Sequence, residues 1–143
     1  MRSIKTDEIG DYTGKHYEGN FNCQLRRLDS LEGAPKSVSG NFYCFSNSNL
    51  ETLEGGPEYV GGHFNCHSNE LESMKGAPVF VGGHFNCINN NNLESLEGLP
   101  QYIGGHFQFD EDLKKGENLY IIANALLNGG FFDEIYVLKQ LFT

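Results

Sequence analysis

Hydrophobic side chains return along this chain at a long and nearly constant interval, not at the short spacing of an amphipathic helix. Phenylalanine stands at positions 21, 42, 64, 85 and 107, so the interval is 21 or 22 residues. Cysteine follows each of the first four phenylalanines by two residues, and Phe109 takes its place in the fifth copy. Leucine at 28, 50, 71 and 93 and proline at 35, 57, 78 and 100 keep the same interval. The chain therefore contains an internal repeat of five copies.

Each copy predicts one short strand and an irregular return. In Phe64-Asn65-Cys66 the apolar side chains flank a polar one, so Phe64 and Cys66 point to the same side of a strand. A glycine pair, Gly61-Gly62 in this copy, precedes the strand and permits a tight entry. The proline at a fixed place in the short stretch between strands leaves no room for an α-helix. We expect return segments that are extended or turn-like.

One copy of this size cannot bury its apolar side alone, but stacked copies cover one another's phenylalanine, cysteine, leucine and valine columns. Successive strands would then pair in parallel at a spacing of about 4.8 Å. The repeat therefore predicts a parallel β-solenoid of five rungs over residues 19–109, with non-helical return segments.

The two ends of the chain lack the repeat and are expected to cap the solenoid. Residues 1–18 form the N-terminal cap, in which Tyr12 and Tyr17 flank a turn signal and predict a small hairpin. Residues 110–143 form a helical C-terminal cap, with helices expected over 118–127 and 131–142. These helices are apolar for their size, so they cover the open end, join two chains into a homodimer, or do both. The side chains proposed for the dimer are Phe132, Ile135, Leu138 and Leu141.

The repeat resembles a known family. The pattern Phe64-x-Cys66-x-x-Asn69-x-Leu71 resembles the leucine-rich-repeat signature L-x-L-x-x-N-x-L, with phenylalanine and cysteine in two leucine positions. The short, proline-containing copy is similar to the compact bacterial form of that repeat. The glycine pair, the Phe-x-Cys strand and the Ser-Leu-x-Gly-x-Pro bend together resemble small repeat proteins of tailed bacteriophages. The first copy departs from the pattern, because Arg26 replaces the asparagine.

The resemblance covers residues 19–109 and implies a solenoid with a general role in binding. It also implies that Asn47, Asn69 and Asn90 form a buried ladder of amides that satisfies backbone groups at the turn. If the resemblance to phage proteins holds, the chain acts in the cytoplasm of a bacterial host and inhibits a host protein, such as a component of antiviral defence.

Composition narrows the classes of function. Ten lysines and arginines against nineteen aspartates and glutamates give a net charge of −9, which argues against binding nucleic acid directly through positive charge. No apolar run reaches the roughly 18 residues that a membrane span requires, so we expect no membrane association. The first residues carry charges and no apolar stretch, so we expect no secretory signal and a cytoplasmic location. The four cysteines are then expected to stay reduced and to pack as small hydrophobic groups.

The outward positions of the strands predict a flat surface almost free of charge. Amides, histidines and three apolar side chains alternate there, a composition that suits contact with a protein partner. The alternative is that like residues stack on one another without a ligand. The residues proposed to bind the partner are Tyr43, Phe45, His63, Asn65, His67, His84, Asn86, Ile88 and His106.

Three of these histidines, His63, His84 and His106, are expected about 5 Å apart in a straight row. They could take a divalent metal, but a straight row is a poor tetrahedral cage, so no metal or other cofactor is expected. No nucleophile or acidic residue accompanies them in a triad-like arrangement, and no catalytic activity is expected.

Acidic residues form two columns on the return segments. They are interpreted as a solvated face that keeps the sheets from aggregating. The alternatives are a strip that attracts a basic partner or imitates nucleic-acid phosphates, and a calcium site, for which the converging oxygens of a loop signature are missing. The residues of this acidic strip are Glu51, Glu54, Glu72, Glu94 and Glu97.

The sequence as a whole predicts a non-catalytic module that binds a partner protein through the strand face. The alternatives are an acidic decoy of a basic, nucleic-acid-binding host enzyme and a structural or assembly subunit. The identity of the partner does not follow from the residues.

Overall fold

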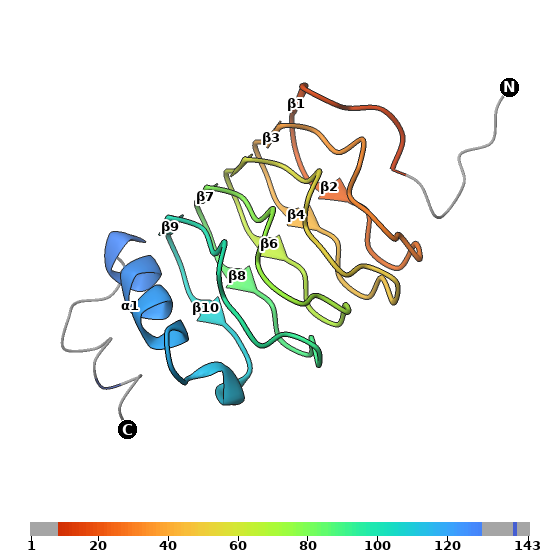
Figure 1. Cartoon of the computed structure of the whole chain (residues 1–143). Helices are drawn as coiled ribbons and strands as arrows, with labels where there is room; N and C mark the ends of the chain where they lie inside the picture. The colour runs from red at the N-terminus through yellow and green to blue at the C-terminus, as the bar shows by residue number, and fades with distance from the viewer. Residues whose placement is uncertain (1–8, 130–138, 140–143) are drawn as a thin grey trace, which may run out of the picture.

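The structure, a computed structural model, describes residues 9–129 and Lys139 and is a parallel β-solenoid with a C-terminal helix (Figure 1). This architecture confirms the predicted fold class. Ten two-residue strands wind around a narrow core, followed by a short 3-10 helix η1 and helix α1 at the end beyond β9 and β10. Their bounds are β1 His16–Tyr17, β2 Phe21–Asn22, β3 Ser37–Val38, β4 Phe42–Tyr43, β5 Tyr59–Val60, β6 Phe64–Asn65, β7 Phe80–Val81, β8 Phe85–Asn86, β9 Tyr102–Ile103, β10 Phe107–Gln108, η1 Glu111–Leu113 and α1 Asn118–Gly129.

The strands form two parallel sheets of five strands each. One sheet has the order β1-β3-β5-β7-β9 and is called the valine sheet, because Val38, Val60, Val81 and Ile103 point from it into the core. The other has the order β10-β8-β6-β4-β2 and is called the phenylalanine sheet. Each rung of the solenoid contributes one strand to each sheet, and every pair is in register at the repeat interval, as in Phe64 opposite Phe85.

The valine sheet was not expected, since each copy was predicted to hold a single strand. The residues before the glycine pair alternate in the same way as those after it. Tyr59 is exposed and Val60 is buried, just as Phe64 is buried and Asn65 faces outward. This alternation is only two residues long, which is too short to distinguish a strand from a turn by its periodicity.

The hairpin expected around Tyr12 and Tyr17 is wrong. A turn does close there, since the Lys15 N–H donates to the Tyr12 carbonyl over 2.9 Å. Strand β1 then pairs in parallel with β3, with Tyr17 opposite Val38, because Tyr17 occupies the first position of the valine column. The valine sheet therefore begins inside the segment predicted as a cap.

The core is a stack of identical columns, as predicted. The rings of Phe21, Phe42, Phe64 and Phe85 stack with centroids 5.3–5.5 Å apart. The four cysteines are free thiols, all buried. The remaining width of the rungs is filled by fully buried side chains, namely Leu28, Leu31, Leu50, Leu53, Leu71, Met74 and Leu96. The dispersion and hydrophobic gain is thus repeated from rung to rung, which no single copy could achieve alone.

Both ends of this stack are covered within the described residues. At the N-terminal end, Tyr12 and Tyr17 meet Phe21 edge to face at 5.1 and 5.0 Å, and Ile9 is buried. At the other end, α1 packs on β9. The helix was predicted over 118–127 and ends two residues later, at Gly129. Its buried residues include Ile122 and Leu126, as expected.

The second predicted helix and the proposed dimer residues Phe132, Ile135, Leu138 and Leu141 lie outside the described residues. Within the described part of the chain, no helix combines the length and apolar character that crossing a membrane would require.

Candidate functional site

The outer face of the phenylalanine sheet brings all nine residues proposed for partner binding into three adjacent columns. Register between β4, β6 and β8 places Tyr43, Asn65 and Asn86 in the middle column. The residues that precede the strands form a second column beside it, and those that follow the strands form the third. His63 and His106 are exposed and the other seven are half-buried. The face is free of charged side chains until Asp110, where the C-terminal end begins.

A ladder of side-chain acceptors runs along the corner between the two sheets. Its members are Asn20, Asn41, His63 and His84, and each accepts the backbone N–H of the equivalent residue one rung further on. The acceptor atoms are Oδ1 of the two asparagines and Nδ1 of the two histidines. The N···O or N···N distances are 2.9, 2.7, 2.8 and 2.8 Å. We call this set, ending at His106, the corner ladder.

This contact fixes the tautomer of the histidines. A backbone N–H can only donate, so Nδ1 of His63 and of His84 must carry a lone pair, and the proton of a neutral ring is then on Nε2. The rings stack 4.5 Å apart, with an angle of 1° between their planes. The pKa of His84 lies below its ordinary value of 6.5, because of desolvation first and the neighbouring His63 and His106 second.

The same tautomer argues against a metal on this row. A metal would need the lone pair of Nε2, but that nitrogen holds the proton as long as Nδ1 accepts its backbone partner. Among the residues that the structure describes, no group of three histidine, cysteine, aspartate or glutamate side chains is placed to hold a metal ion.

The corner ladder also explains the glycine that precedes each of its members after Asn20. A Cβ on Gly83 would lie 2.3 Å from His63 Nδ1, and one on Gly62 would lie 2.2 Å from Asn41 Oδ1. The glycine one position earlier is needed for another reason, since a Cβ on Gly82 would lie 2.2 Å from the Gly61 carbonyl oxygen. The glycine pair was expected to permit a tight entry into the strand, and the structure shows that the close approach of successive rungs requires it.

In the middle column of the face, the side-chain oxygens accept hydrogen bonds from the solenoid's own backbone. Asn65 Oδ1 accepts the His67 N–H at 3.2 Å, and Asn86 Oδ1 accepts the Ile88 N–H at 3.0 Å. Their amide N–H groups have no partner among the described residues. Together with the Nε2–H groups of His63 and His84, these amides offer N–H donors on this part of the face.

The third column adds an aromatic patch. Phe45 stacks on His67 with centroids 4.7 Å apart and meets Tyr43 edge to face at 6.1 Å. Desolvation lowers the pKa of His67, so this imidazole is neutral at neutral pH. Ile88 extends the patch by one more rung.

The buried polar and sulfur columns have structural roles. Asn69 Oδ1 accepts the Asn47 N–H at 2.7 Å, while its Nδ2 donates to the carbonyls of Cys44 and Cys66 at 3.1 and 2.9 Å. Asn47 and Asn90 make equivalent bonds, so the predicted buried amide ladder is present. Burial raises the pKa of the Cys23 thiol to about 12, and that of Cys44 and Cys66 well above normal, so these thiols are poor nucleophiles.

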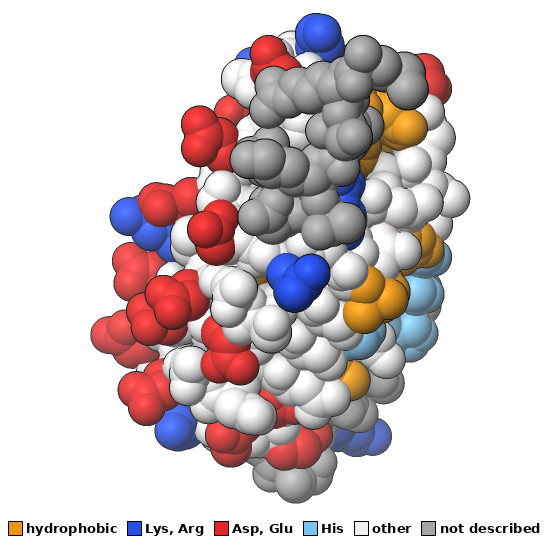
Figure 2. Space-filling view, turned by 90° about the vertical axis from the view of Figure 1, so that its right-hand side faces the viewer, with side chains coloured by type: hydrophobic (Ala, Val, Ile, Leu, Met, Phe, Trp, Pro, Cys, Tyr) orange, Lys and Arg blue, Asp and Glu red, His pale blue; other side chains and the backbone are white. Residues whose placement is uncertain are grey.

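The acidic strip lies apart from the strand face. In the view of Figure 2, acidic side chains gather along one side and histidines along the opposite side. All five glutamates of the strip are exposed. One cation interrupts it, since Lys75 Nζ lies 3.2 Å from Glu54 Oε1.

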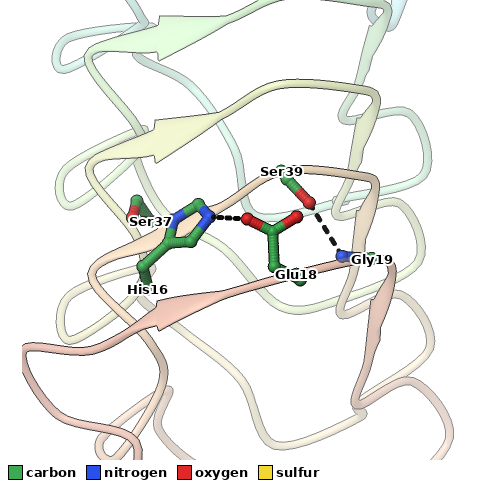
Figure 3. A network of polar contacts seen from close by, with 5 residues as sticks. All are labelled: His16, Glu18, Gly19, Ser37 and Ser39. Atoms are coloured by element: carbon green, nitrogen blue, oxygen red, sulfur yellow. Dashed lines mark hydrogen bonds and ion pairs between the residues drawn. The ribbon is translucent and has the colours of Figure 1, made fainter.

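One polar cluster was missed by the sequence analysis. On the valine sheet, His16 contacts Ser37 through Nδ1 at 2.6 Å and Glu18 through Nε2 at 2.7 Å (Figure 3). A signal existed, because Ser37 follows His16 by one repeat interval and Glu18 lies two residues after His16, just beyond the strand. The repeat was taken to begin at residue 19, which hid this register.

Comparison with protein-family models, with curated proteins and with solved structures gives no match.

Proposed function

We propose that this protein is a binding module that holds a partner protein on the outer face of the phenylalanine sheet. The observation that carries the proposal is the outward alignment of nine uncharged residues, with an aromatic patch of Tyr43, Phe45 and His67 among them. Aromatic side chains that are already ordered lose little entropy on binding, and amides beside them supply directional hydrogen bonds.

The hydrogen-bond accounting indicates what the partner offers. Nδ1 of His63 and of His84 and Oδ1 of Asn65 and of Asn86 are engaged within the solenoid. What remains on this part of the face is a set of N–H donors. We therefore infer that the partner presents backbone carbonyls or other oxygen acceptors, since unpaired donors would otherwise be buried at a cost of about 1–3 kcal/mol each.

The test is capture of the partner from a cell in which the protein acts. Tyr43→Ala combined with Phe45→Ala should abolish capture. Tyr59→Ala combined with Tyr102→Ala is the matched control, because it removes comparable aromatic surface from the valine sheet and should leave capture intact. Equal capture by both double variants would contradict the proposal.

The family and setting belong to the same proposal. Kinship with short leucine-rich repeats and with phage-encoded repeat proteins would make the partner a bacterial host protein, in the cytoplasm, whose activity is blocked. The repeat pattern of residues 19–109 supports this reading.

A second candidate function rests on the acidic strip, whose five glutamates are exposed, and acidic side chains gather along one side of the molecule in Figure 2. It would attract the basic groove of an enzyme that handles nucleic acids. Replacing Glu51, Glu54, Glu94 and Glu97 by lysine should then destroy inhibition, and added salt should weaken it. Binding that is indifferent to both would leave the strand face as the interaction surface.

A further inference from the structure

The polar cluster on the valine sheet has the composition of an activated nucleophile. His16 and Ser37 lie opposite each other in the register of β1 and β3, so their side chains share the outer face of the sheet. Ser37 Oγ lies 2.6 Å from His16 Nδ1, and Glu18 Oε1 lies 2.7 Å from His16 Nε2 (Figure 3). A hydroxyl, an imidazole and a carboxylate are therefore connected in that order.

The charge of the Glu18 carboxylate decides which atom of the cluster carries each proton. The pKa of Glu18 is lowered, first by the hydrogen bond from His16 and then by one from Ser39, so Glu18 is ionised at neutral pH and can only accept. The imidazole proton must then sit on Nε2, which leaves the lone pair of Nδ1 free to accept the Ser37 O–H. This is the proton arrangement in which a histidine acts as general base toward a serine.

An apolar strip begins on the next rung. The column that holds His16 and Ser37 continues, strand by strand, through Tyr59, Phe80 and Tyr102. These three rings stack with centroids 4.8 and 4.6 Å apart. Val79 beside them is 52% exposed. The strip extends for three rungs from Ser37, or about 14 Å at about 4.8 Å per rung.

We propose that Ser37 is a nucleophilic acylation site, activated by His16 and positioned by Glu18, that accepts the acyl group of medium-chain fatty acyl esters. The open column beside the hydroxyl would hold the alkyl chain along the ring edges of Tyr59, Phe80 and Tyr102.

The step transfers one acyl group and one proton. The Ser37 hydroxyl proton passes to His16 Nδ1 while Oγ attacks the carbonyl carbon of the ester. The tetrahedral intermediate collapses, the bond to the leaving alcohol breaks, and that oxygen takes the proton from His16. The products are acyl-Ser37 and the free alcohol. Glu18 stays ionised and stabilises the transient imidazolium through Nε2–H.

The experiment uses the full chain with 4-nitrophenyl octanoate and 4-nitrophenyl acetate. Release of nitrophenol gives the rate, and peptide mass spectrometry locates the acyl group. We expect one acyl group per chain, on Ser37, and no labelling of Ser37→Ala. His16→Gln should slow the reaction by about 10²-fold, the lower end of general-base catalysis. Glu18→Gln should slow it by about tenfold, less than loss of the base itself.

Three controls separate a reactive serine from one that merely forms hydrogen bonds. Imidazole added to His16→Gly should restore labelling, which no structural role of the ring predicts. Tyr59→Ala should remove the preference for octanoate while labelling by acetate persists. Ser95→Ala, a serine on a return segment whose hydroxyl accepts the Glu97 N–H, should change nothing. Acylation of lysines or of other serines, or a rate unaffected by His16→Gln, would overturn the proposal.

This activity lies on the sheet that the proposed partner does not contact. Capture of the partner can therefore fail while Ser37 is acylated, and the reverse can also occur, so the two proposals are tested independently.

Discussion

The molecule contains two polar ladders that differ in what each side chain must do. The buried amide ladder, Asn47, Asn69 and Asn90, accepts a backbone N–H on one side and donates to two carbonyls on the other. The corner ladder is exposed or half-buried, and within it each side chain need only accept one N–H. A primary amide is the only ordinary side chain that can meet the first demand in so little space, whereas asparagine and histidine both meet the second.

This difference explains how the two columns vary along the chain. The amide ladder holds asparagine in every interior rung and loses it only at the two ends, to Arg26 in the first rung and to Asp112 in the last. The corner ladder changes from asparagine at 20 and 41 to histidine at 63, 84 and 106 without any change in the backbone contact. A backbone N–H that needs a partner therefore requires an acceptor atom at that place. It requires one particular residue type only where the side chain is buried.

The largest predicted effect is on the buried ladder. Asn69→Leu keeps the volume but leaves the Asn47 N–H without a partner and removes one of the two amide donors to each of the carbonyls of Cys44 and Cys66. An unsatisfied buried N–H costs about 1–3 kcal/mol and each lost hydrogen bond about 1 kcal/mol, so we expect the free energy of unfolding to fall by about 4 kcal/mol. Urea denaturation measures it. Asn65→Ala, a surface asparagine of the same rung, is the control, and a loss of similar size there would contradict the comparison.

The next effect concerns the space beneath the corner ladder. In Gly83→Ala, the new Cβ would lie 2.3 Å from His63 Nδ1, and forcing the ring aside should cost about 2 kcal/mol. Because the conflict is with a side chain, His63→Ala should recover part of that loss in the double variant. If a double-mutant cycle shows no coupling between the two substitutions, Gly83 is needed for the conformation of the backbone and not for the space that His63 occupies.

A smaller effect tests whether the corner ladder needs only an acceptor atom at position 84 or needs histidine itself. His84→Leu leaves the His106 N–H without its partner and should lower the free energy of unfolding by about 1 kcal/mol, because the corner is partly open to water. His84→Asn supplies an equivalent Oδ1 and should be nearly neutral at pH 7. If both variants lose the same stability, stacking of the rings rather than the hydrogen bond holds the corner.

The smallest effect is a dependence on acidity that the buried ladder lacks. The folded state lowers the pKa of His84 below 6.5, chiefly by desolvation, so the unfolded chain binds this proton first. The free energy of unfolding should therefore fall as the pH drops from about 6.5 through the folded pKa of His84. Above pH 6.5 this histidine should cause no change in stability. Urea midpoints across this range should be flatter for His84→Asn than for the unchanged chain.

Much of the fold could be predicted from sequence because the repeat columns report burial directly. The phenylalanine, cysteine and leucine columns each predicted an inward position, the family resemblance implied the same for the asparagines, and all four columns are buried. The valine sheet escaped prediction because its strands are two residues long and three of the five are followed directly by glycines, which carry no side-chain pattern. The reason for the glycine pair was also hidden, since it depends on an atom one full rung away.

For the candidate site, position could be predicted but hydrogen-bond roles could not. The outward direction of Tyr43, His63 and Asn65 follows from alternation along a strand. That His63 must be an acceptor depends on which backbone group meets its ring. The grouping of His16, Glu18 and Ser37 required the register of β1 against β3, and the repeat lattice that would have given it starts later in the sequence.

The matching of glycine to ladder acceptor is made between each rung and the one before it, and it is the same at every interior step. A rung can therefore be inserted or deleted without new contacts having to be invented at either junction. Gene duplication of a segment such as 62–82 would lengthen the recognition surface by one fixed increment of about 4.8 Å. The length of the binding surface can thus change, by evolution or by design, in whole repeats.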